Sequence, residues 1–251
     1  MKTAIYFLDA SSVPEEEALL RAAGELSRSR QEKAAKLRFP EDRILSLGAG
    51  LLLDRGLQRY GLRERDLELE YRHNGKPYLK HYPELYFNLS HSGTMVMAVF
   101  SDREIGCDIE KIRKTKMVLV HRYFTKNEQL FLEQERPEQE TDRLFSRYWT
   151  LKESVLKATG EGMRLPLDSF ELQLAEFPSE APVNLVWHTE AGKKFSSFSF
   201  REYEFSGYQA AVCRDGADNV SFFSTGNDFV GISPLKKPSS FIFLIRFHAC
   251  W

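Results

Sequence analysis

The sequence has few of the residues that build disulfide frameworks or thiolate metal sites. Its three cysteines, Cys107, Cys213 and Cys250, are odd in number and far apart, and no two form a C-x-x-C pair. Neither a disulfide-rich secreted domain nor a zinc site is therefore indicated. A reducing cytoplasm is the expected compartment.

Other common signatures are missing as well. The sequence has no Walker-type phosphate loop, no G-x-G-x-x-G fingerprint and no G-x-S-x-G elbow, so kinase-like, Rossmann and hydrolase sites are not indicated. No apolar stretch is long enough to span a bilayer. The run from Ala4 to Leu8 is too short for the core of a signal peptide. A formal net charge of -1 gives no global attraction to nucleic acid or anionic membranes.

What is present suits a globular protein. The 251 residues are 42% hydrophobic and 28% charged, which is enough chain for one large domain or two small ones. A strand is predicted at Thr3 to Leu8, and a helical region over Ser27 to Gly61 breaks at Pro40 and ends with Gly61 as its C-cap. Further strands are predicted at Leu67 to Arg72, Tyr86 to Leu89 and Met95 to Phe100.

The second half repeats this plan. It has a strand at Ile105 to Glu110, helices at Thr125 to Gln134 and Thr141 to Thr159, and then strands at Ser169 to Leu174, Val183 to His188, Ser196 to Tyr203 and Tyr208 to Cys213. The repeat predicts an α+β fold of two similar lobes, each a small antiparallel sheet packed on a long helix. We expect lobes at 1–104 and 105–215. The tail at 216–251 is interpreted as an added strand, a partner-binding segment or a disordered end.

Two carboxylates stand at alternate positions in the strand predicted after residue 104. On a strand, Asp108 and Glu110 point to the same face, and like charges so close repel unless a cation lies between them. Oxygen ligands of this kind suit Mg²⁺, which completes its shell with water and phosphate oxygens. A solvated strand edge is the alternative interpretation, because D-x-E is a common pattern.

A second charged group lies on the long helix of the second half. Glu153 and Lys157 share one helical face at i and i+4, which alone favours a surface salt bridge. Trp149 and Leu156 flank them at helical spacing, so the helix is predicted to be partly buried, where an acid and an amine are suited to catalysis. Lys152 is expected to be solvated, with its stem packed along apolar surface.

Basic residues and a Ser-His pair mark a candidate phosphate-binding region. The segment from Arg28 to Arg43 is rich in Lys and Arg, and Lys76 follows in a G-K-P turn. His91, beside Ser90 at the end of a predicted strand, is suited either to bind a phosphate or to bond the backbone. A charge run is usually a solvated helix face and gains a binding role only where it converges on a polyphosphate.

Taken in order and at compatible spacing, three motifs resemble those of the 4′-phosphopantetheinyl transferases of the surfactin-synthetase-activating type. They are F-N-L-S-H-S at 87–92, I-G-C-D-I-E at 105–110 and W-T-L-K-E-S-V-L-K at 149–157. The likeness extends to about residue 214. Three residues depart from the family pattern: Arg30 stands where lysine is familiar, Ser46 where threonine is expected, and Cys107 replaces an aliphatic residue, which a small buried hydrophobe can do.

The resemblance implies a pseudo-dimer in one chain, with the active site and coenzyme A in the cleft between the lobes. Such enzymes move the phosphopantetheinyl arm of coenzyme A to a serine of an apo carrier protein and release 3′,5′-ADP. Carried over by position, Asp108, Glu110 and Glu153 hold Mg²⁺, or Mn²⁺ in its place, against the pyrophosphate. Lys157 neutralises or protonates the leaving phosphate. Glu153 takes the serine proton, directly or through water.

The resemblance also implies the contacts to coenzyme A and the partner. The expected contacts are Arg30, Lys33, Ser46, Lys76, Ser90 and His91, together with Arg43 of the basic run. The partner is an acidic acyl or peptidyl carrier domain of fatty acid, polyketide or nonribosomal peptide synthesis. The stretch from Lys111 to Phe131 has basic and apolar residues suited to docking it; ordinary packing on its own lobe is the alternative. A monomer is expected, with no nucleic acid or membrane partner.

Two other functions fit the same residues. A non-catalytic module that binds coenzyme A or a carrier protein would not need Asp108, Glu110, Glu153 and Lys157 intact, and all four are present. A Mg²⁺-dependent phosphohydrolase would use the same carboxylates with water as the nucleophile. The fate of the phosphopantetheinyl group, on protein or in solution, distinguishes the hydrolase from the transferase.

Overall fold

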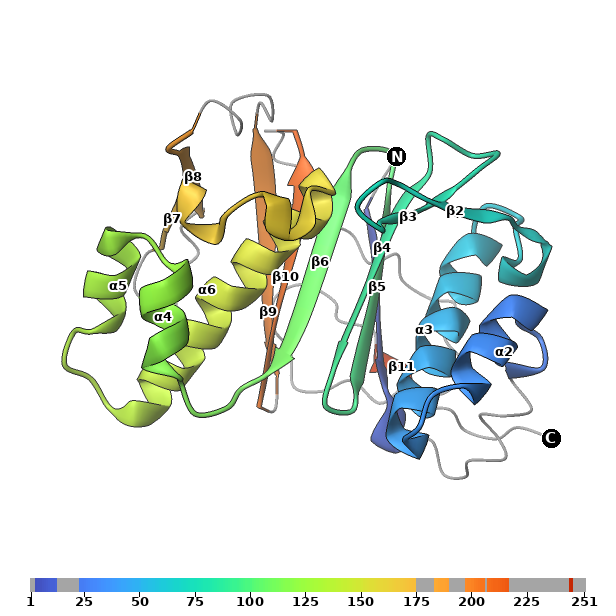
Figure 1. Cartoon of the computed structure of the whole chain (residues 1–251). Coiled ribbons are helices and arrows are strands. Elements are labelled where there is room, and N and C mark those ends of the chain that lie inside the picture. Colours follow the sequence, from blue (N-terminus) through green and yellow to red (C-terminus); the bar gives the residue numbers. More distant parts are fainter. Residues whose placement is uncertain are drawn as a thin grey trace. The chain divides into compact units, whose positions relative to one another are not determined.

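The structure is a computed structural model, and it describes residues 3–12, 23–174, 183–189, 197–205, 207–216 and 244–245. The chain divides into two compact units. Unit 1 comprises Met1–Tyr71, Pro77–Asp102 and Val220–Trp251, and unit 2 comprises Arg72–Lys76 and Arg103–Asn219. Figure 1 shows the elements of both units. None of the described helices is long and apolar enough to cross a membrane.

Unit 1 is a sheet packed on one long helix. Its sheet has the order β11-β1-β5-β4, in which β5 pairs antiparallel with both β1 and β4, while β11 pairs parallel with β1. Helix α3 packs on β5, and α2 packs on α3. The bounds are β1 Ala4–Asp9, η1 Ala10–Ser12, α2 Arg28–Ala35, α3 Pro40–Gln58, η2 Glu64–Asp66, β2 Leu69–Tyr71, β3 Pro77–Leu79, β4 Tyr86–Ser92, β5 Met95–Ser101 and β11 Leu244–Ile245.

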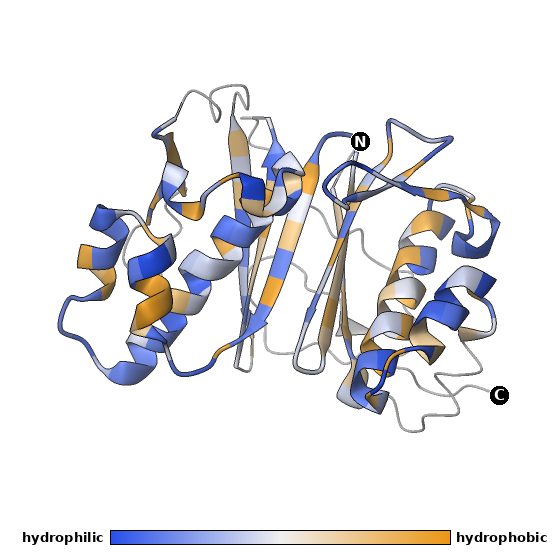
Figure 2. Ribbon diagram, viewed as in Figure 1, coloured by the Kyte–Doolittle hydropathy of each residue, from blue (hydrophilic) through white to orange (hydrophobic). Residues whose placement is uncertain are grey.

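Unit 2 repeats the arrangement with a different sheet. Its main sheet has the antiparallel order β6-β10-β9, and α6 lies across β6 and β10. Figure 2 shows hydrophobic residues among hydrophilic ones on α4 and α6, as expected of amphipathic helices. The bounds are β6 Ile105–Lys111, α4 Met117–Tyr123, α5 Lys126–Leu132, α6 Glu138–Thr159, η3 Gly162–Arg164, η4 Leu167–Ser169, β7 Phe170–Gln173, β8 Asn184–Trp187, β9 Phe198–Phe205 and β10 Tyr208–Asp215.

Helix boundaries follow local chemistry. The Ser27 side chain accepts a hydrogen bond from the backbone N–H of Arg30 and caps α2, and Pro40 begins α3 at a position that needs no N–H donor. Thr125 and Glu128 form a reciprocal capping box at the start of α5, and α6 ends at Gly160 with a left-handed φ of 67°. These termini agree with the sequence prediction.

The predicted α+β fold, a small sheet on a long helix in each unit, is confirmed. Some local predictions differ from the structure; the helix predicted to begin at Thr141, for example, begins at Glu138. Gly61 was predicted to cap α3, but the helix ends at Gln58 and Gly61 lies in the turn beyond it, with a φ of 70°. The stretch from Lys111 to Phe131 contains the helix α4, which was not predicted from the sequence and has no side-chain cap. Of the tail, the structure describes only Gly216 and β11; the rest lies outside the described residues.

The sheet and the helix of unit 2 approach each other closely at Gly106 on β6. A Cβ added there would collide with backbone atoms of Ser154 and Ala158 on α6. Backbone atoms cannot move aside as a flexible side chain can, so only glycine fits this position without displacing the helix. The spacing between β6 and α6 therefore depends on one missing side chain.

Replacing Gly106 with alanine should accordingly lower the free energy of unfolding by about 2–4 kcal/mol, because α6 must shift off the sheet. Urea denaturation followed by circular dichroism measures this change. Gly48→Ala is the matched control, since its Cβ would meet only the Leu8 and Val96 side chains at 3.0 Å and 3.5 Å. Its effect should stay within about 1 kcal/mol. Equal losses in the two variants would contradict this account of Gly106.

Candidate functional site

Unit 2 brings together the charged residues of two sequence motifs. Asp108 and Glu110 lie on β6, Glu153 and Lys157 lie on α6, and the helix packs directly on the strand. The ammonium Nζ of Lys157 lies 2.6 Å from Oδ1 of Asp108, whose side chain is buried. Residues 49 positions apart in the chain are thus joined by one ion pair.

The charges at this site act on one another. Burial raises the pKa of Glu153 above its ordinary value, and the negative charges of Asp108 and Glu110 raise it further, while Lys157 opposes the shift. Burial alone would lower the pKa of Lys157, but its neighbours, Asp108 first and Glu153 among them, more than offset this and the pKa is raised. Glu153 is therefore a stronger base than an ordinary carboxylate, and it lies beside Lys157, which keeps its proton.

The predicted metal ligands are Asp108, Glu110 and Glu153. Within the described ranges, no three or more His, Cys, Asp or Glu side chains are grouped so that they could hold a metal ion. The Asp108 carboxylate is instead paired with Lys157. The metal site consequently stays a prediction, supported by the mutual repulsion that the three carboxylates exert at Glu153.

Cys107 lies between the motif residues as an inert side chain. It is fully buried, and burial raises the pKa of its thiol to about 12. A neutral thiol is neither a nucleophile nor a metal ligand at neutral pH. Its interpretation as a small buried hydrophobe is confirmed.

Residues predicted to contact coenzyme A in unit 1 lie on α2, α3 and β4. Arg30 donates from Nε to Oε1 of the buried Glu64 at 2.8 Å. Lys33 is exposed on α2. On α3, Arg43 is exposed and donates to the Leu37 carbonyl at 2.8 Å, and Ser46 is half-buried.

The Ser-His pair lies at the end of β4. Ser90 is buried and stands opposite Met97, whereas the next residue, His91, is exposed and stands opposite Val96. The alternation along the strand turns the two side chains to opposite faces. Of the two side chains, that of His91 is therefore on the exposed face of the strand.

Lys76, predicted as a phosphate contact, is held inside unit 2. Its ammonium donates to Glu104 Oε2 at 2.8 Å and to the carbonyls of Ile105 and Ala158 at 3.0 and 3.1 Å. Burial lowers its pKa, and Glu104 opposes that shift. An ammonium has three donors, and these three acceptors engage all of them. Lys76 thus ties the turn after β2 to the start of β6 and the end of α6.

Comparisons with known proteins show the family to which the chain belongs. The family model "4'-phosphopantetheinyl transferase superfamily" matches residues 104–213, and "4'-phosphopantetheinyl transferase, N-terminal" matches residues 12–102. The transferase Sfp of Bacillus subtilis (strain 168) is 32% identical over 190 residues, which are 75% of this chain and 81% of Sfp. The chain belongs to the 4′-phosphopantetheinyl transferase family.

Another relative supports the same family assignment. The transferase psf-1 of Bacillus pumilus is 33% identical over 75% of this chain and 78% of its own. The structure of the Helicobacter pylori holo-[acyl-carrier-protein] synthase in complex with coenzyme A matches 45% of this chain and 99% of that chain at 19% identity, with a TM-score of 0.36. That likeness is too weak to add to the assignment. The enzyme is a phosphopantetheinyl transferase of the Sfp type, as the motifs predicted.

One residue of this transferase was predicted wrongly. Lys152 was expected to be solvated, but its side chain is fully buried. Its ammonium lies 2.9 Å from Glu128 Oε1, donates to the carbonyls of Leu167 and Phe170 at 2.7 and 3.0 Å, and lies 4.4 Å from the centre of the Phe170 ring. The signal was present in the helical spacing, because Lys152 follows the buried Tyr148 by four residues.

This buried pair holds the helix that carries Glu153. Glu128 is 1% exposed and also accepts from the Leu172 backbone N–H at 2.8 Å. It therefore links α5, α6 and β7 through a single carboxylate. A buried ion pair of this kind is costly to break from one side, because the remaining charge has no water to solvate it.

Lys152→Met in this transferase should lower the free energy of unfolding by about 3–5 kcal/mol, because Glu128 is then left buried without its cation. The double variant Lys152→Met, Glu128→Gln should recover most of the loss. Urea midpoints of the four chains in this cycle measure the coupling. Purely additive losses would mean that the ion pair is not what stabilises α6.

Proposed function

We propose that the enzyme transfers the 4′-phosphopantetheinyl group of coenzyme A to a serine of an apo carrier protein. The observation that carries the proposal is the Lys157–Asp108 ion pair beside the half-buried Glu153, in a chain of this family. In the reaction the serine Oγ forms a bond to phosphorus, the bridging P–O bond of the pyrophosphate breaks, and 3′,5′-ADP leaves. Such a transfer needs positioning and charge neutralisation more than covalent chemistry by the protein.

A divalent cation, Mg²⁺ or Mn²⁺, fits the donor set. Asp108, Glu110 and Glu153 would hold it. The negative charges of Asp108 and Glu110 repel that of Glu153, and a bound cation would neutralise this repulsion. When bound, the ion supplies charge stabilisation to the pyrophosphate oxygens. All three residues offer carboxylate oxygens, which are the ligands that a hard cation such as Mg²⁺ prefers.

Lys157 and Glu153 would carry the proton and charge balance. The raised pKa of Lys157 keeps it an ammonium, so it neutralises the leaving phosphate or gives it a proton. The raised pKa of Glu153 makes it a stronger base than an ordinary carboxylate. Glu153 therefore takes the serine proton, directly or through water.

Coenzyme A would be held by basic and hydroxyl groups outside the carboxylate cluster. The proposed contacts are Lys33, Arg43, Ser46, Lys76, Ser90 and His91. Of these, Lys33, Arg43 and His91 are exposed and accessible to a ligand. Lys76 would need to exchange one of its protein acceptors for a phosphate oxygen. Arg30, which the resemblance adds to this set, is paired with Glu64.

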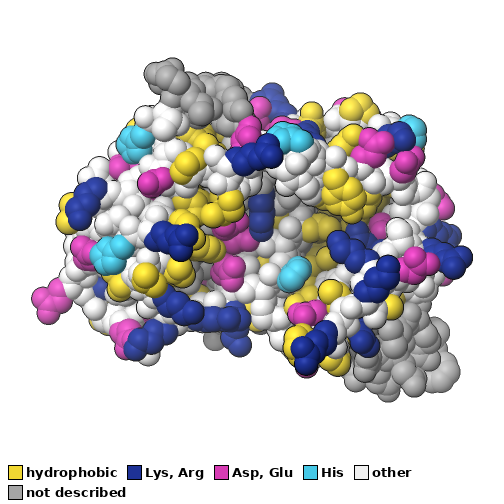
Figure 3. Space-filling model, viewed as in Figure 1, with side chains coloured by type: hydrophobic (Ala, Val, Ile, Leu, Met, Phe, Trp, Pro, Cys, Tyr) yellow, Lys and Arg dark blue, Asp and Glu magenta, His cyan; other side chains and the backbone are white. Residues whose placement is uncertain are grey.

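The carrier protein would dock on α4 and α5. Val118 and Leu130 are 68% and 53% exposed, and Lys116 and Arg122 are exposed beside them. On the face in Figure 3, hydrophobic and basic side chains lie next to each other over this part of unit 2. An acidic helix with an apolar stripe is the complementary partner. We expect the enzyme to act as a monomer in the cytoplasm.

Intact-protein mass spectrometry of an apo carrier protein, incubated with the enzyme, coenzyme A and Mg²⁺, tests the function. We expect a gain of one phosphopantetheinyl group, which EDTA abolishes, and no gain with Asp108→Ala, which removes a metal ligand. Consumption of coenzyme A without modified carrier would indicate a hydrolase. Bound but unconsumed coenzyme A, tested on acyl and peptidyl carriers, would indicate a binding module.

Lys157→Ala should lower kcat at least about 100-fold while changing the Kd for coenzyme A less than about fivefold, because the lysine acts on the leaving group. Calorimetry gives the binding constant and the mass assay gives turnover. Lys80→Ala, outside all of the proposed contacts, is the control for loss of a surface cation. Equal losses in kcat and affinity would make Lys157 a binding residue only.

A further inference from the structure

The sheet of unit 2 carries a row of three polar side chains that begins at Glu110. On β6, Gly106 faces α6, and alternation along the strand turns Asp108 and Glu110 to the same face. Gln209 of β10 stands directly opposite Glu110, and Glu204 of β9 stands directly opposite Gln209. Residues paired across antiparallel strands point to one face. The three residues Glu110, Gln209 and Glu204, here called the Glu110 row, therefore all face α6.

A second row on the same face shows how the acids of this sheet are neutralised. It consists of Asp108 on β6, Ala211 on β10 and Glu202 on β9. Helix α6 supplies a cation to each acid. Nζ of Lys157 lies 2.6 Å from Oδ1 of Asp108. Nε of Arg147 lies 2.6 Å from Oε2 of Glu202. The middle residue of this row, Ala211, has no polar side-chain atom and contributes no hydrogen bond.

The Glu110 row differs from the second row at its middle position. Its outer acid, Glu204, forms an ion pair with Arg143 of α6. Gln209 takes the place that alanine has in the second row, and its amide is a hydrogen-bond donor on the strand next to Glu110. The negative charge of Glu110 contributes to the raised pKa of Glu153. The sheet thus offers Glu110 a neutral donor.

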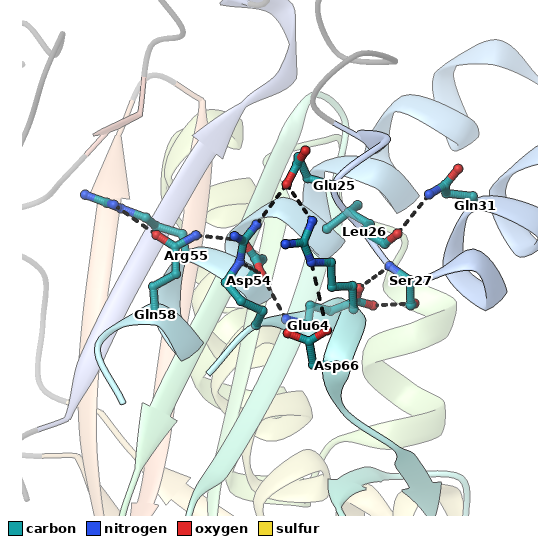
Figure 4. A network of polar contacts seen from close by, with 11 residues as sticks. Glu25, Leu26, Ser27, Gln31, Asp54, Arg55, Gln58, Glu64 and Asp66 are labelled. Carbon is teal, nitrogen blue, oxygen red and sulfur yellow. Dashed lines mark hydrogen bonds and ion pairs between the residues drawn. The ribbon is translucent and has the colours of Figure 1, made fainter. Parts of the chain in front are cut away.

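The amide of Gln209 is buried without a hydrogen bond. Gln209 is 1% exposed, and its Nε2 has no hydrogen-bond partner among the residues that the structure describes. Figure 4 shows the usual outcome, in which the buried carboxylate of Asp54 accepts the Gln58 amide at 2.7 Å and the Glu64 backbone N–H at 2.8 Å. An unsatisfied buried donor costs free energy, so its presence beside the carboxylates indicates a partner that arrives with the ligand.

We infer that Gln209 is a positioning residue for Glu110: its amide donates to the Glu110 carboxylate when the divalent cation is bound and fixes that carboxylate as a ligand. Carboxylates that ligate a metal are normally oriented by such an outer hydrogen bond. Asp108 is oriented by Lys157. A neutral amide orients Glu110 and leaves its negative charge to the cation. This inference rests on the proposed function, in which Glu110 is a metal ligand.

The test is Gln209→Met, which keeps the length of the side chain and removes the amide. It should raise the Kd for Mn²⁺ about tenfold or more, measured by calorimetry with coenzyme A at saturation. It should also raise the melting temperature of the metal-free enzyme by about 2–4 °C, because an unsatisfied buried donor is removed. A gain in stability together with a loss of metal affinity is a result that a merely structural side chain would not give.

Thr3→Val is the matched control. Thr3 in unit 1 is buried, and its hydroxyl also has no hydrogen-bond partner within the described part of the chain. The variant should raise the melting temperature in the same way and leave the Kd for Mn²⁺ within about twofold of wild type. Gln209→Ala is a second test variant, since Ala211 shows that alanine fits the same place in the second row. It should weaken Mn²⁺ binding as methionine does.

A double-mutant cycle with Glu110→Gln tests whether Gln209 acts through Glu110. In the Glu110→Gln background, Gln209→Met should change the Kd for Mn²⁺ by less than about twofold. An undiminished effect there would overturn the inference, and so would an unchanged Kd for Mn²⁺ in both single Gln209 variants. A raised Kd for coenzyme A in EDTA would overturn it too, because Gln209 would then be a direct ligand of the cofactor.

The Mn²⁺ titration also separates this inference from the proposed function. Wild-type enzyme that binds Mn²⁺ and coenzyme A but modifies no carrier protein would refute the transfer, while the Gln209 variants would still decide the role of the amide. Wild-type enzyme that modifies the carrier protein in EDTA and binds no Mn²⁺ would overturn the inference and leave the transfer standing.

Discussion

The packing of α6 on β6 without an intervening side chain at Gly106 is the constraint on which the site depends. The carboxylates Asp108 and Glu110 stand on the strand, and Glu153 and Lys157 stand on the helix. The backbone of Lys157 itself lies at this contact, since its carbonyl carbon would be 2.8 Å from a Cβ at Gly106. The glycine therefore has a geometric role, and the chemistry of the site follows from the spacing that it permits.

Buried charge pairs hold the elements around that contact. Lys152 and Glu128 join α6 to α5 and β7, whereas Arg30 and Glu64 join α2 to η2. A pair of this kind adds little net stability over an apolar contact, yet losing one partner is expensive. These pairs therefore make each helix position specific. Their donors to backbone carbonyls, as in Lys152, fix the loops in the same way.

Much of the fold was readable from local signals. The caps at Ser27 and Thr125, the break at Pro40 and the end at Gly160 are interactions within a few residues, so the sequence reveals them directly. Helix α4 was not predicted because its seven residues are too few to show a helical period, whereas the long helices α3 and α6, which also lack a capping side chain, show one. The motif carboxylates were predicted as a group, and the structure brings their charges close enough to shift the pKa of Glu153.

The sequence by itself determined the residue types of the site and the family, because motif spacing and helical periodicity are properties of one chain segment at a time. Tertiary structure alone decided which lysine and arginine side chains form ion pairs within the protein. Lys152 pairs with Glu128, Lys76 with Glu104 and Arg30 with Glu64, and the partners of each pair are at least 24 residues apart in the chain. The cost of burying a charge depends on what surrounds it in space, and no pattern along the chain records that surrounding.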